Sequence, residues 1–167
     1  MPDLILLAIG SNLPSPTFGP PRAVCEAALL ELSRRGLRIV KRSRWFESAP
    51  VPLSDQPWFV NGVAAVETSL PPADLLALLH EVERGFGRER RAVNEARILD
   101  LDLIAYRDLV RTDAPPLLPH PRLQERAFVL LPLAELVPDW RHPATGRTVA
   151  ELISALPPDQ VARPLPG

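Results

Sequence analysis

Two aspartates, Asp100 and Asp102, lie in a stretch that otherwise has the composition of a β-strand, residues 98–106. Strands are depleted in aspartate, and a carboxylate without a partner on an apolar surface is costly. Because side chains alternate along a strand, both carboxylates would point to one face, roughly 6.5 to 7 Å apart. This spacing suits a divalent ion, or two ions bridged by phosphate oxygens, and an all-oxygen ligand set favours Mg²⁺ or Mn²⁺ over Zn²⁺.

The alternative is that both aspartates are simply solvated, on the open face of a sheet that has helices on one side only. The same alternation divides the other residues of the stretch between the two faces. The leucine face is expected to pack on helices and comprises Leu99, Leu101, Leu103 and Ala105. The aspartate face is expected to include Ile98, Ile104 and Tyr106.

An arginine-rich segment, residues 84–97, directly precedes the aspartates. It has five arginines against Glu89 and Glu95, a local charge of +3 (five minus two), and two glycines. A flexible basic loop beside two carboxylates can clamp a polyphosphate while a metal bridges phosphate and aspartate. Because Lys41 is the only lysine in this arginine-rich chain, a solvated charged loop is the alternative. The position of the loop next to the aspartates favours polyphosphate.

Length and composition indicate one domain, residues 1–167, because 46% hydrophobic residues are enough for a sizeable core. A net charge of −1 argues against a globally basic nucleic-acid binder. The single cysteine, Cys25, excludes a disulfide framework and a cysteine-based metal site, and it favours a reducing, cytoplasmic setting. The apolar run at residues 4–9 is too short for a signal peptide or a membrane span, so it is predicted to be a strand.

Hydrophobic periodicity and proline positions predict the elements that must place these residues. Strand-like runs cover residues 4–9, 37–47, 59–68 and 98–106. Apolar residues at helical spacing cover residues 20–36 and 72–87, and a last helix is predicted over residues 148–156. The order β-α-β-β-α-β predicts an α+β, ferredoxin-like fold, in which an antiparallel sheet carries helices on one face, with C-terminal helical additions. The fold by itself does not decide function.

Five motifs carry a resemblance to a known family: "AIGSNL", "DQPWFVNGVAAVET", "EVERGFGRERR", "ARILDLDLIAY" and "LPHPRLQERAFVLLPLAEL". In this order they resemble 6-hydroxymethyl-7,8-dihydropterin pyrophosphokinases, enzymes of folate biosynthesis that move a pyrophosphoryl group from ATP to a pterin hydroxymethyl group. The resemblance runs from near residue 4 to about residue 140. It implies a ferredoxin-like fold, ATP and a reduced pterin as substrates, and Mg²⁺ as cofactor.

The resemblance also implies roles for individual residues. Asp100 and Asp102 would hold two Mg²⁺ ions that bridge the ATP phosphates, and Arg88 and Arg90 of a mobile loop would act with them in catalysis. The implied ATP site consists of His80, Glu83, Arg88, Arg90, Arg97, Leu103, His120 and Arg126. The implied pterin site consists of Ser48, Ala49, Val51, Phe59, Asn61, Asp100 and Phe128.

These roles agree with the chemistry of the side chains. Phe59 and Phe128 would sandwich the flat pterin ring, and Asn61 would hydrogen-bond its polar edge. The alternatives are that both phenylalanines belong to the core, that Asn61 bonds neighbouring backbone, and that His120 is a structural histidine in a turn. Gly10-Ser11-Asn12 is interpreted as a strand-ending turn without a chemical role.

The chain departs from the family pattern at three places. The segment "NEAR" stands where the family commonly has an arginine and a tryptophan, so the loop over the nucleotide is expected to pack differently. Pro115 and Leu117 stand where some members supply an arginine and a threonine to ATP, and Ala49 replaces a pocket proline. The metal and pterin sites are therefore better supported by the resemblance than the full set of ATP contacts.

Two other functions compete with this interpretation. A ferredoxin-like RNA- or metabolite-binding module is the first, although an RNA-binding sheet exposes aromatic residues and this chain has only 5% aromatics. A different metal-dependent phosphoryl or nucleotidyl transferase is the second. The expected partners are small-molecule substrates, with no nucleic acid and no membrane. A monomer is expected because no long apolar patch is evident.

Overall fold

The first apolar run forms strand β1 (Ile5–Ser11), which pairs antiparallel with β4 (Phe59–Glu67) on one side and β5 (Asp100–Tyr106) on the other. The computed structural model describes residues 4–50, 57–87 and 98–166. Ile5 and Leu7 are buried in the core on one face of the sheet and Leu6 in the core on the other. This burial on both faces explains why the run is apolar without alternation.

Three further strands complete the sheet around β4. The predicted strand over residues 37–47 is divided into β2 (Arg38–Arg42) and β3 (Phe46–Ser48), which both pair with β4, and β6 (Ala162–Pro164) pairs with β3. The order is β5-β1-β4-β3-β6, with β2 also beside β4, and every pair is antiparallel. The division occurs at Ser43, whose Oγ accepts a hydrogen bond from the Val63 N–H at 3.0 Å. A side chain thereby replaces a backbone partner in the ladder.

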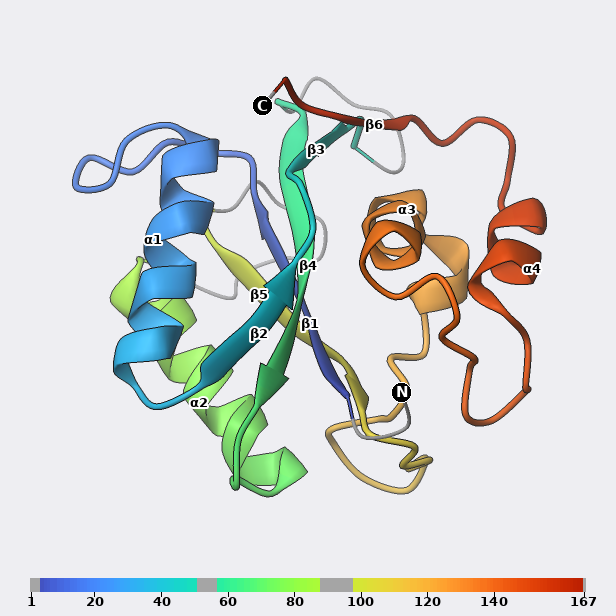
Figure 1. Ribbon diagram of the computed structural model, residues 1–167. Helices are drawn as coiled ribbons and strands as arrows, with labels where there is room; N and C mark the ends of the chain where they lie inside the picture. Colours follow the sequence, from blue (N-terminus) through green and yellow to red (C-terminus); the bar gives the residue numbers. More distant parts are fainter. Residues whose placement is uncertain (1–3, 51–56, 88–97, 167) are drawn as a thin grey trace.

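Two helices of 14 residues each, α1 (Pro21–Arg34) and α2 (Pro72–Gly85), cover one face of the sheet (Figure 1). Each begins with a proline in its first turn, a position where the missing N–H costs no helical hydrogen bond. Leu29, Leu32, Leu75 and Leu79 pack with the β1 residues Ile5, Leu7 and Ile9. These two predicted helices are confirmed.

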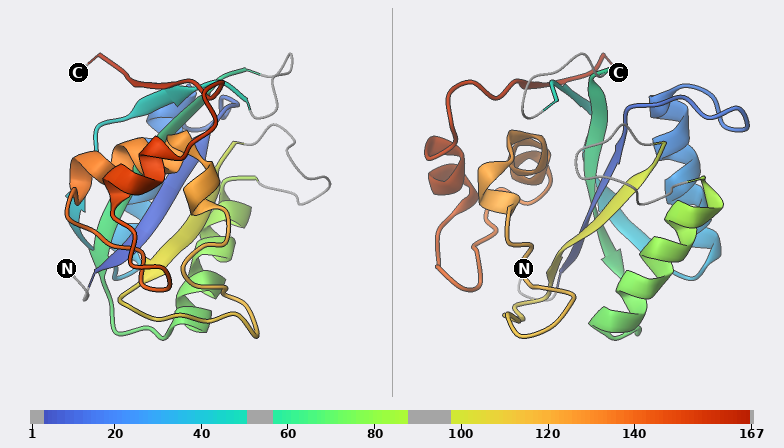
Figure 2. Two further views of the ribbon diagram at one scale, coloured as in Figure 1. Left: turned by 90° about the vertical axis from the view of Figure 1, so that its right-hand side faces the viewer. Right: turned by 180° about the vertical axis from the view of Figure 1, so that it is seen from behind.

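The opposite face is covered by α3 (Ala127–Leu136), and α4 (Val149–Ser154) packs on the outer side of α3, as the two views of Figure 2 show. The expectation of an open face was therefore wrong. Sequence analysis assigned no element to α3 because six of its ten residues are buried and the helix lacks the polar stripe that reveals an amphipathic helix. The predicted last helix is α4, and Thr148 and Glu151 form a capping box at its start. No helix in the described ranges combines the length and apolarity needed to cross a bilayer.

A β-bulge in β5 corrects the predicted division of its residues between faces. Leu6 pairs with Ala105 and Leu7 pairs with Leu103, which leaves Ile104 as an extra residue. Beyond the bulge the alternation is reversed, so Tyr106 packs in the core under α1 and α2, and Ala105 joins the core under α3. The hydroxyl of Tyr106 donates to the Leu70 carbonyl just before α2.

An ionic cluster links α1 to the break between β2 and β3. The carboxylate of Glu26 accepts hydrogen bonds from Arg42 at 2.6 and 2.8 Å and from the Trp45 indole N–H at 2.9 Å. The hydrogen bonds from Arg42 are the main cause that lowers the pKa of Glu26 from 4.5 to about 2. The Trp45 ring in turn lies against Gly62, where a Cβ atom would be only 2.6 Å from the ring. The cluster therefore holds the indole against β4.

We expect Glu26→Gln to lower the free energy of unfolding near pH 7 by about 1 kcal/mol, because the ion pair with Arg42 is lost and a neutral amide offers only one acceptor oxygen. The folded-state pKa of about 2 lies below the ordinary 4.5, so the stabilisation is present above pH 4.5 and is lost as the pH falls toward 2. Urea denaturation at several pH values measures the difference between wild type and variant. Glu31→Gln, which removes only exposed pairs on the same helix, is the control and should cost less. A difference that does not shrink between pH 7 and pH 3 would contradict this assignment.

Candidate active site

The centre of the candidate site is the backbone of Gly10 in β1, which pairs with Asn61 of β4 on one side and with Asp100 of β5 on the other. A Cβ atom at Gly10 would lie 2.9 Å from the Asn61 side-chain nitrogen. The glycine therefore permits the amide to lie over the β1 backbone, and no side chain stands between Asn61 and Asp100. Sequence analysis missed this role. A glycine inside a strand was the available signal, because it often marks a close approach.

Asn61, Asp100 and Asp102 share the face of the sheet that α3 covers. Val63, two residues after Asn61, belongs to the core under α3, and so does Ile104, two residues after Asp102. Gly10 and Ala8, the β1 residues beside the aspartates, are small. Asp100 is half-buried, and the Asp102 side chain is 30% exposed. Both carboxylates therefore lie at the surface of a partly covered sheet edge.

The two aspartates suit a hard cation. In the ranges that the structure describes, no group of three or more His, Cys, Asp or Glu side chains could hold a metal ion. Mg²⁺ is usually bound by one or two carboxylates together with water and substrate phosphates. Arg126 Nη1 lies 3.9 Å from Asp102 Oδ2, so a positive group already stands beside the pair.

Glu83 of α2 holds the strand between the two aspartates. Its carboxylate, 1% exposed, accepts a hydrogen bond of 2.7 Å from the Leu101 N–H. Because β5 is at the edge of the sheet, this N–H points away from β1 and needs a partner. Glu83 was predicted to line the ATP site, and this bond also makes it a support of β5. His80 lies one turn earlier in α2, half-buried, and the Leu103 side chain packs in the core under α1 and α2.

His120 lies along the outer edge of β5. Its backbone N–H donates to the Ile104 carbonyl at 2.8 Å, and its ring Nδ1 accepts from the Arg122 backbone N–H at 3.1 Å. Burial, followed by the positive charge of Arg126, lowers the pKa of His120 to about 4, although Asp100 acts in the opposite direction. The imidazole is therefore neutral at pH 7, and because Nδ1 accepts, we assign its proton to Nε2. His120 can thus donate a hydrogen bond as a neutral group.

Asn61 is oriented by Ser48 on the neighbouring strand. The Ser48 hydroxyl donates to Asn61 Oδ1 at 2.5 Å, and Asn61 is only 6% exposed. Among residues 4–50, 57–87 and 98–166, the Asn61 nitrogen has no hydrogen-bond partner. The amide nitrogen, held in this orientation, can donate a hydrogen bond to an acceptor on a ligand.

The remaining predicted pterin residues flank this amide. Phe59, two residues before Asn61 in β4, faces the same side of the sheet, and Phe128 lies in the first turn of α3, the helix over that side. The Ala49 N–H is occupied by the Val161 carbonyl at 3.1 Å. Four predicted residues, Arg88, Arg90, Arg97 and Val51, lie outside the described residues.

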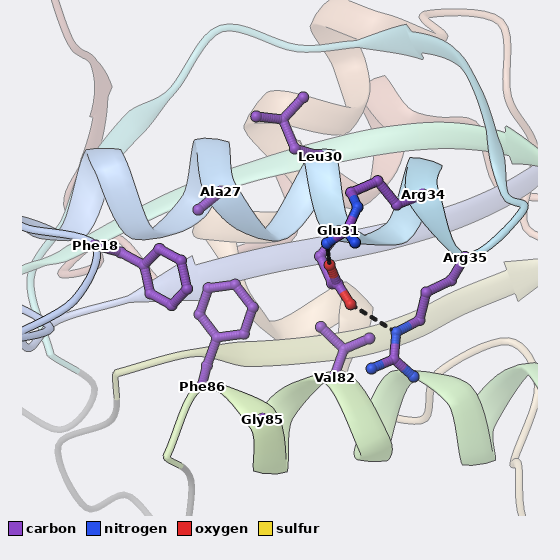
Figure 3. Close-up of a pocket in the computed structure, with 9 residues that line it drawn as sticks. All are labelled: Phe18, Ala27, Leu30, Glu31, Arg34, Arg35, Val82, Gly85 and Phe86. Atoms are coloured by element: carbon purple, nitrogen blue, oxygen red, sulfur yellow. Dashed lines mark hydrogen bonds and ion pairs between the residues drawn. The ribbon is translucent and has the colours of Figure 1, made fainter.

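A separate cavity of about 600 Å³ lies between α1 and α2 (Figure 3). Its apolar wall includes Phe18 and Phe86, whose rings stack at a centroid distance of 4.4 Å. Its charged residues are partnered, since Glu31 bonds both Arg34 and Arg35. The cavity contains none of the predicted site residues and lies on the helical layer opposite α3, so it is not the candidate site.

Comparison with known proteins agrees with the geometry. The family model described as "7,8-dihydro-6-hydroxymethylpterin-pyrophosphokinase (HPPK)" matches residues 6–138. A protein of Pseudomonas aeruginosa named 2-amino-4-hydroxy-6-hydroxymethyldihydropteridine pyrophosphokinase is 43% identical over 165 residues, covering 98% of this chain and 97% of its own length. A Synechocystis protein of the same name is 38% identical over 149 residues, covering 89% of this chain and 73% of its own length.

A solved structure shares the fold. The HPPK-DHPS triple mutant of Plasmodium falciparum matches with a TM-score of 0.67 at 15% identity, over 90% of this chain and 44% of that one. This chain thus spans less than half of that longer protein. The family model covers most of the 167 residues, and both bacterial relatives exceed 30% identity over most of their length. The chain therefore belongs to the 7,8-dihydro-6-hydroxymethylpterin-pyrophosphokinase family.

Proposed function

We propose that this protein transfers the pyrophosphoryl group of ATP to the hydroxymethyl oxygen of 6-hydroxymethyl-7,8-dihydropterin and releases AMP, as a step of folate biosynthesis. The placement of Asn61 and Asp100 on either side of Gly10 carries the proposal. Asn61 and Asp100 lie on strands two apart in the sheet, which separates their backbones by roughly 9.5 Å. The Asn61 amide can bind the edge of a heterocycle, and the Asp100 carboxylate can bind a metal ion. The names of the bacterial relatives support the same reaction.

The pterin is assigned to the side of Asn61. Its Nδ2 donates to an acceptor on the pterin edge, in an orientation that the hydrogen bond from Ser48 determines. Phe59 and Phe128 stack on the two faces of the ring, while Ala49 and Val51 limit the pocket. Stacking supplies affinity, and the amide supplies selection, because a ligand without the acceptor would leave Nδ2 unpaired.

The triphosphate is assigned to the side of β5. Asp100 and Asp102 would hold two Mg²⁺ ions, and Arg126, the neutral His120 and the loop residues Arg88, Arg90 and Arg97 contact phosphate. His80 lies beside the nucleotide. The side chains of Glu83 and Leu103 are buried, so these two residues shape the ATP site through the β5 backbone. When bound, Mg²⁺ neutralises phosphate charge and lowers the pKa of the attacking hydroxyl. The hydroxymethyl oxygen attacks the β-phosphorus in line, and AMP leaves. The arginines keep the phosphate oriented for this displacement and stabilise its negative charge.

We further propose that residues 1–167 act as one monomeric pyrophosphokinase domain in the cytoplasm and bind no nucleic acid. The sheet order β5-β1-β4-β2, with α1 and α2 on one face, supports a ferredoxin-like core. The layer of α3 and α4 is an addition to that core.

Purified protein incubated with ATP, Mg²⁺ and the reduced pterin is expected to form AMP and the pterin diphosphate. Separation of the nucleotides by ion-exchange chromatography distinguishes AMP from ADP. Formation of ADP would mean that the γ-phosphorus is attacked instead. Absence of turnover together with absence of pterin binding would refute the proposed function.

Asp100→Asn and Asp102→Asn are each expected to lower kcat by at least about 100-fold, because each loses a charged metal ligand. Melting temperatures should stay close to that of wild type, since both side chains are partly exposed. Asp108→Asn is the matched control, because Asp108 is an exposed aspartate just after β5. Activity within tenfold of wild type in either test variant would remove that aspartate from the metal site.

Gly10→Ala is expected to raise the KM for the pterin by about 10-fold or more while changing the KM for ATP much less, because the new Cβ displaces the Asn61 amide. Ser48→Ala, which leaves the backbone unchanged but removes the orienting hydroxyl, should act in the same direction. The control is Gly85→Ala, where a Cβ would meet nothing within 4 Å. If pterin binding is unchanged in Gly10→Ala and Ser48→Ala, Asn61 does not read the pterin edge.

A further inference from the structure

The C-terminal tail after α4 reaches back to the candidate site. We propose that Gln160 is a positioning residue that holds Arg126 beside Asp102 and Phe128, and that β6 connects this arrangement to the wall that carries Ser48. The inference rests on the proposed function, since its consequence is measured in the same reaction.

Gln160 binds the backbone on both sides of Arg126. Its Oε1 accepts from the Ala127 N–H at 2.8 Å, and its Nε2 donates to the Glu125 carbonyl at 2.5 Å. The N-cap residue of α3, Arg126, makes no side-chain cap of its own. Gln160, 33 positions after Ala127 in the chain, therefore satisfies a free N–H at the start of this helix. With one peptide group bonded on each side, the backbone position of Arg126 is determined.

The Arg126 side chain lies close both to Asp102, on the proposed phosphate side of the site, and to Phe128, on the proposed pterin side. Its Nη1 is 3.9 Å from Asp102 Oδ2, and its guanidinium carbon is 5.5 Å from the centroid of the Phe128 ring. Only 25% of the side chain is exposed. A change in the backbone at residue 126 would therefore move a positive charge near the phosphate side and an aromatic ring near the pterin side together.

The tail continues from Gln160 directly along the pterin wall. The Val161 carbonyl accepts from the Ala49 N–H at 3.1 Å, and Ala162 of β6 pairs with Ser48 of β3. Figure 1 shows the tail crossing from α4 to β3 over the end of the sheet. The segment thus joins the start of α3 to the strand whose serine orients Asn61. An amide at residue 160 is needed because the contact uses one acceptor and one donor.

A double-mutant cycle with Arg126 tests this role. Gln160→Ala is expected to lower kcat/KM for the pterin by about 10-fold and to weaken pterin binding measured by calorimetry. In an Arg126→Ala background the same change should have almost no effect, because the group that Gln160 positions is gone. A role in general stability would instead lower both quantities by the same factor in both backgrounds, and this result would overturn the proposal.

Two further variants make the result decisive. Gln160→Met keeps the volume of the side chain but removes both hydrogen bonds, so it should reproduce the loss even if Gln160→Ala folds poorly. Gln124→Ala is the matched control, since Gln124 is exposed and makes one hydrogen bond, to the Pro121 carbonyl at 3.0 Å. If wild type is active and Gln160→Met stays within twofold of it, the inference fails while the proposed function stands. An inactive wild type that binds no pterin would refute the proposed function itself.

Discussion

The site depends on the missing side chain at Gly10. In the middle of a sheet whose faces are otherwise covered by apolar residues, this position lets a buried amide from β4 and a carboxylate from β5 approach the same stretch of β1 backbone. A Cβ atom there would lie only 2.9 Å from the amide nitrogen, closer than side-chain packing allows. The conformational cost of a glycine in a strand is offset by a close approach that no other residue allows.

The strand with the aspartates is held by groups from both layers. Glu83 comes from α2 and binds the Leu101 N–H, whereas His120 follows β5 and binds the Ile104 carbonyl. These bonds satisfy the outer edge of β5, which would otherwise present unpaired backbone groups to solvent or to another chain. The edge strand is consequently ordered at the place where it carries the two carboxylates.

The charges around Asp102 are not explained by stability. A pair separated by 3.9 Å between partly exposed groups contributes little to folding. Arg126 also lowers the pKa of His120, after the larger effect of burial, so a neutral donor and a fixed cation stand next to each other. Such a pair can bind phosphate oxygens at neutral pH without a change of protonation. This arrangement is consistent with phosphoryl chemistry, which requires positioning and charge neutralisation more than proton transfer.

The residue pattern was sufficient to predict local structure and part of the site. Apolar runs and periodicity predicted α1, α2 and the strands β1, β4 and β5, and the spacing of Asp100 and Asp102 placed both on one face. The strands β2 and β3 were predicted as one strand, and β6 was not predicted. The pattern could not reveal α3, in which Glu135 is the single charged residue, or the bulge at Ile104, which depends on the register with β1. The contacts of Gly10 with Asn61 and of Gln160 with residues 125 and 127 were also decided only by the tertiary structure. They join residues far apart in the chain, and no local periodicity encodes which backbone group a distant side chain will meet.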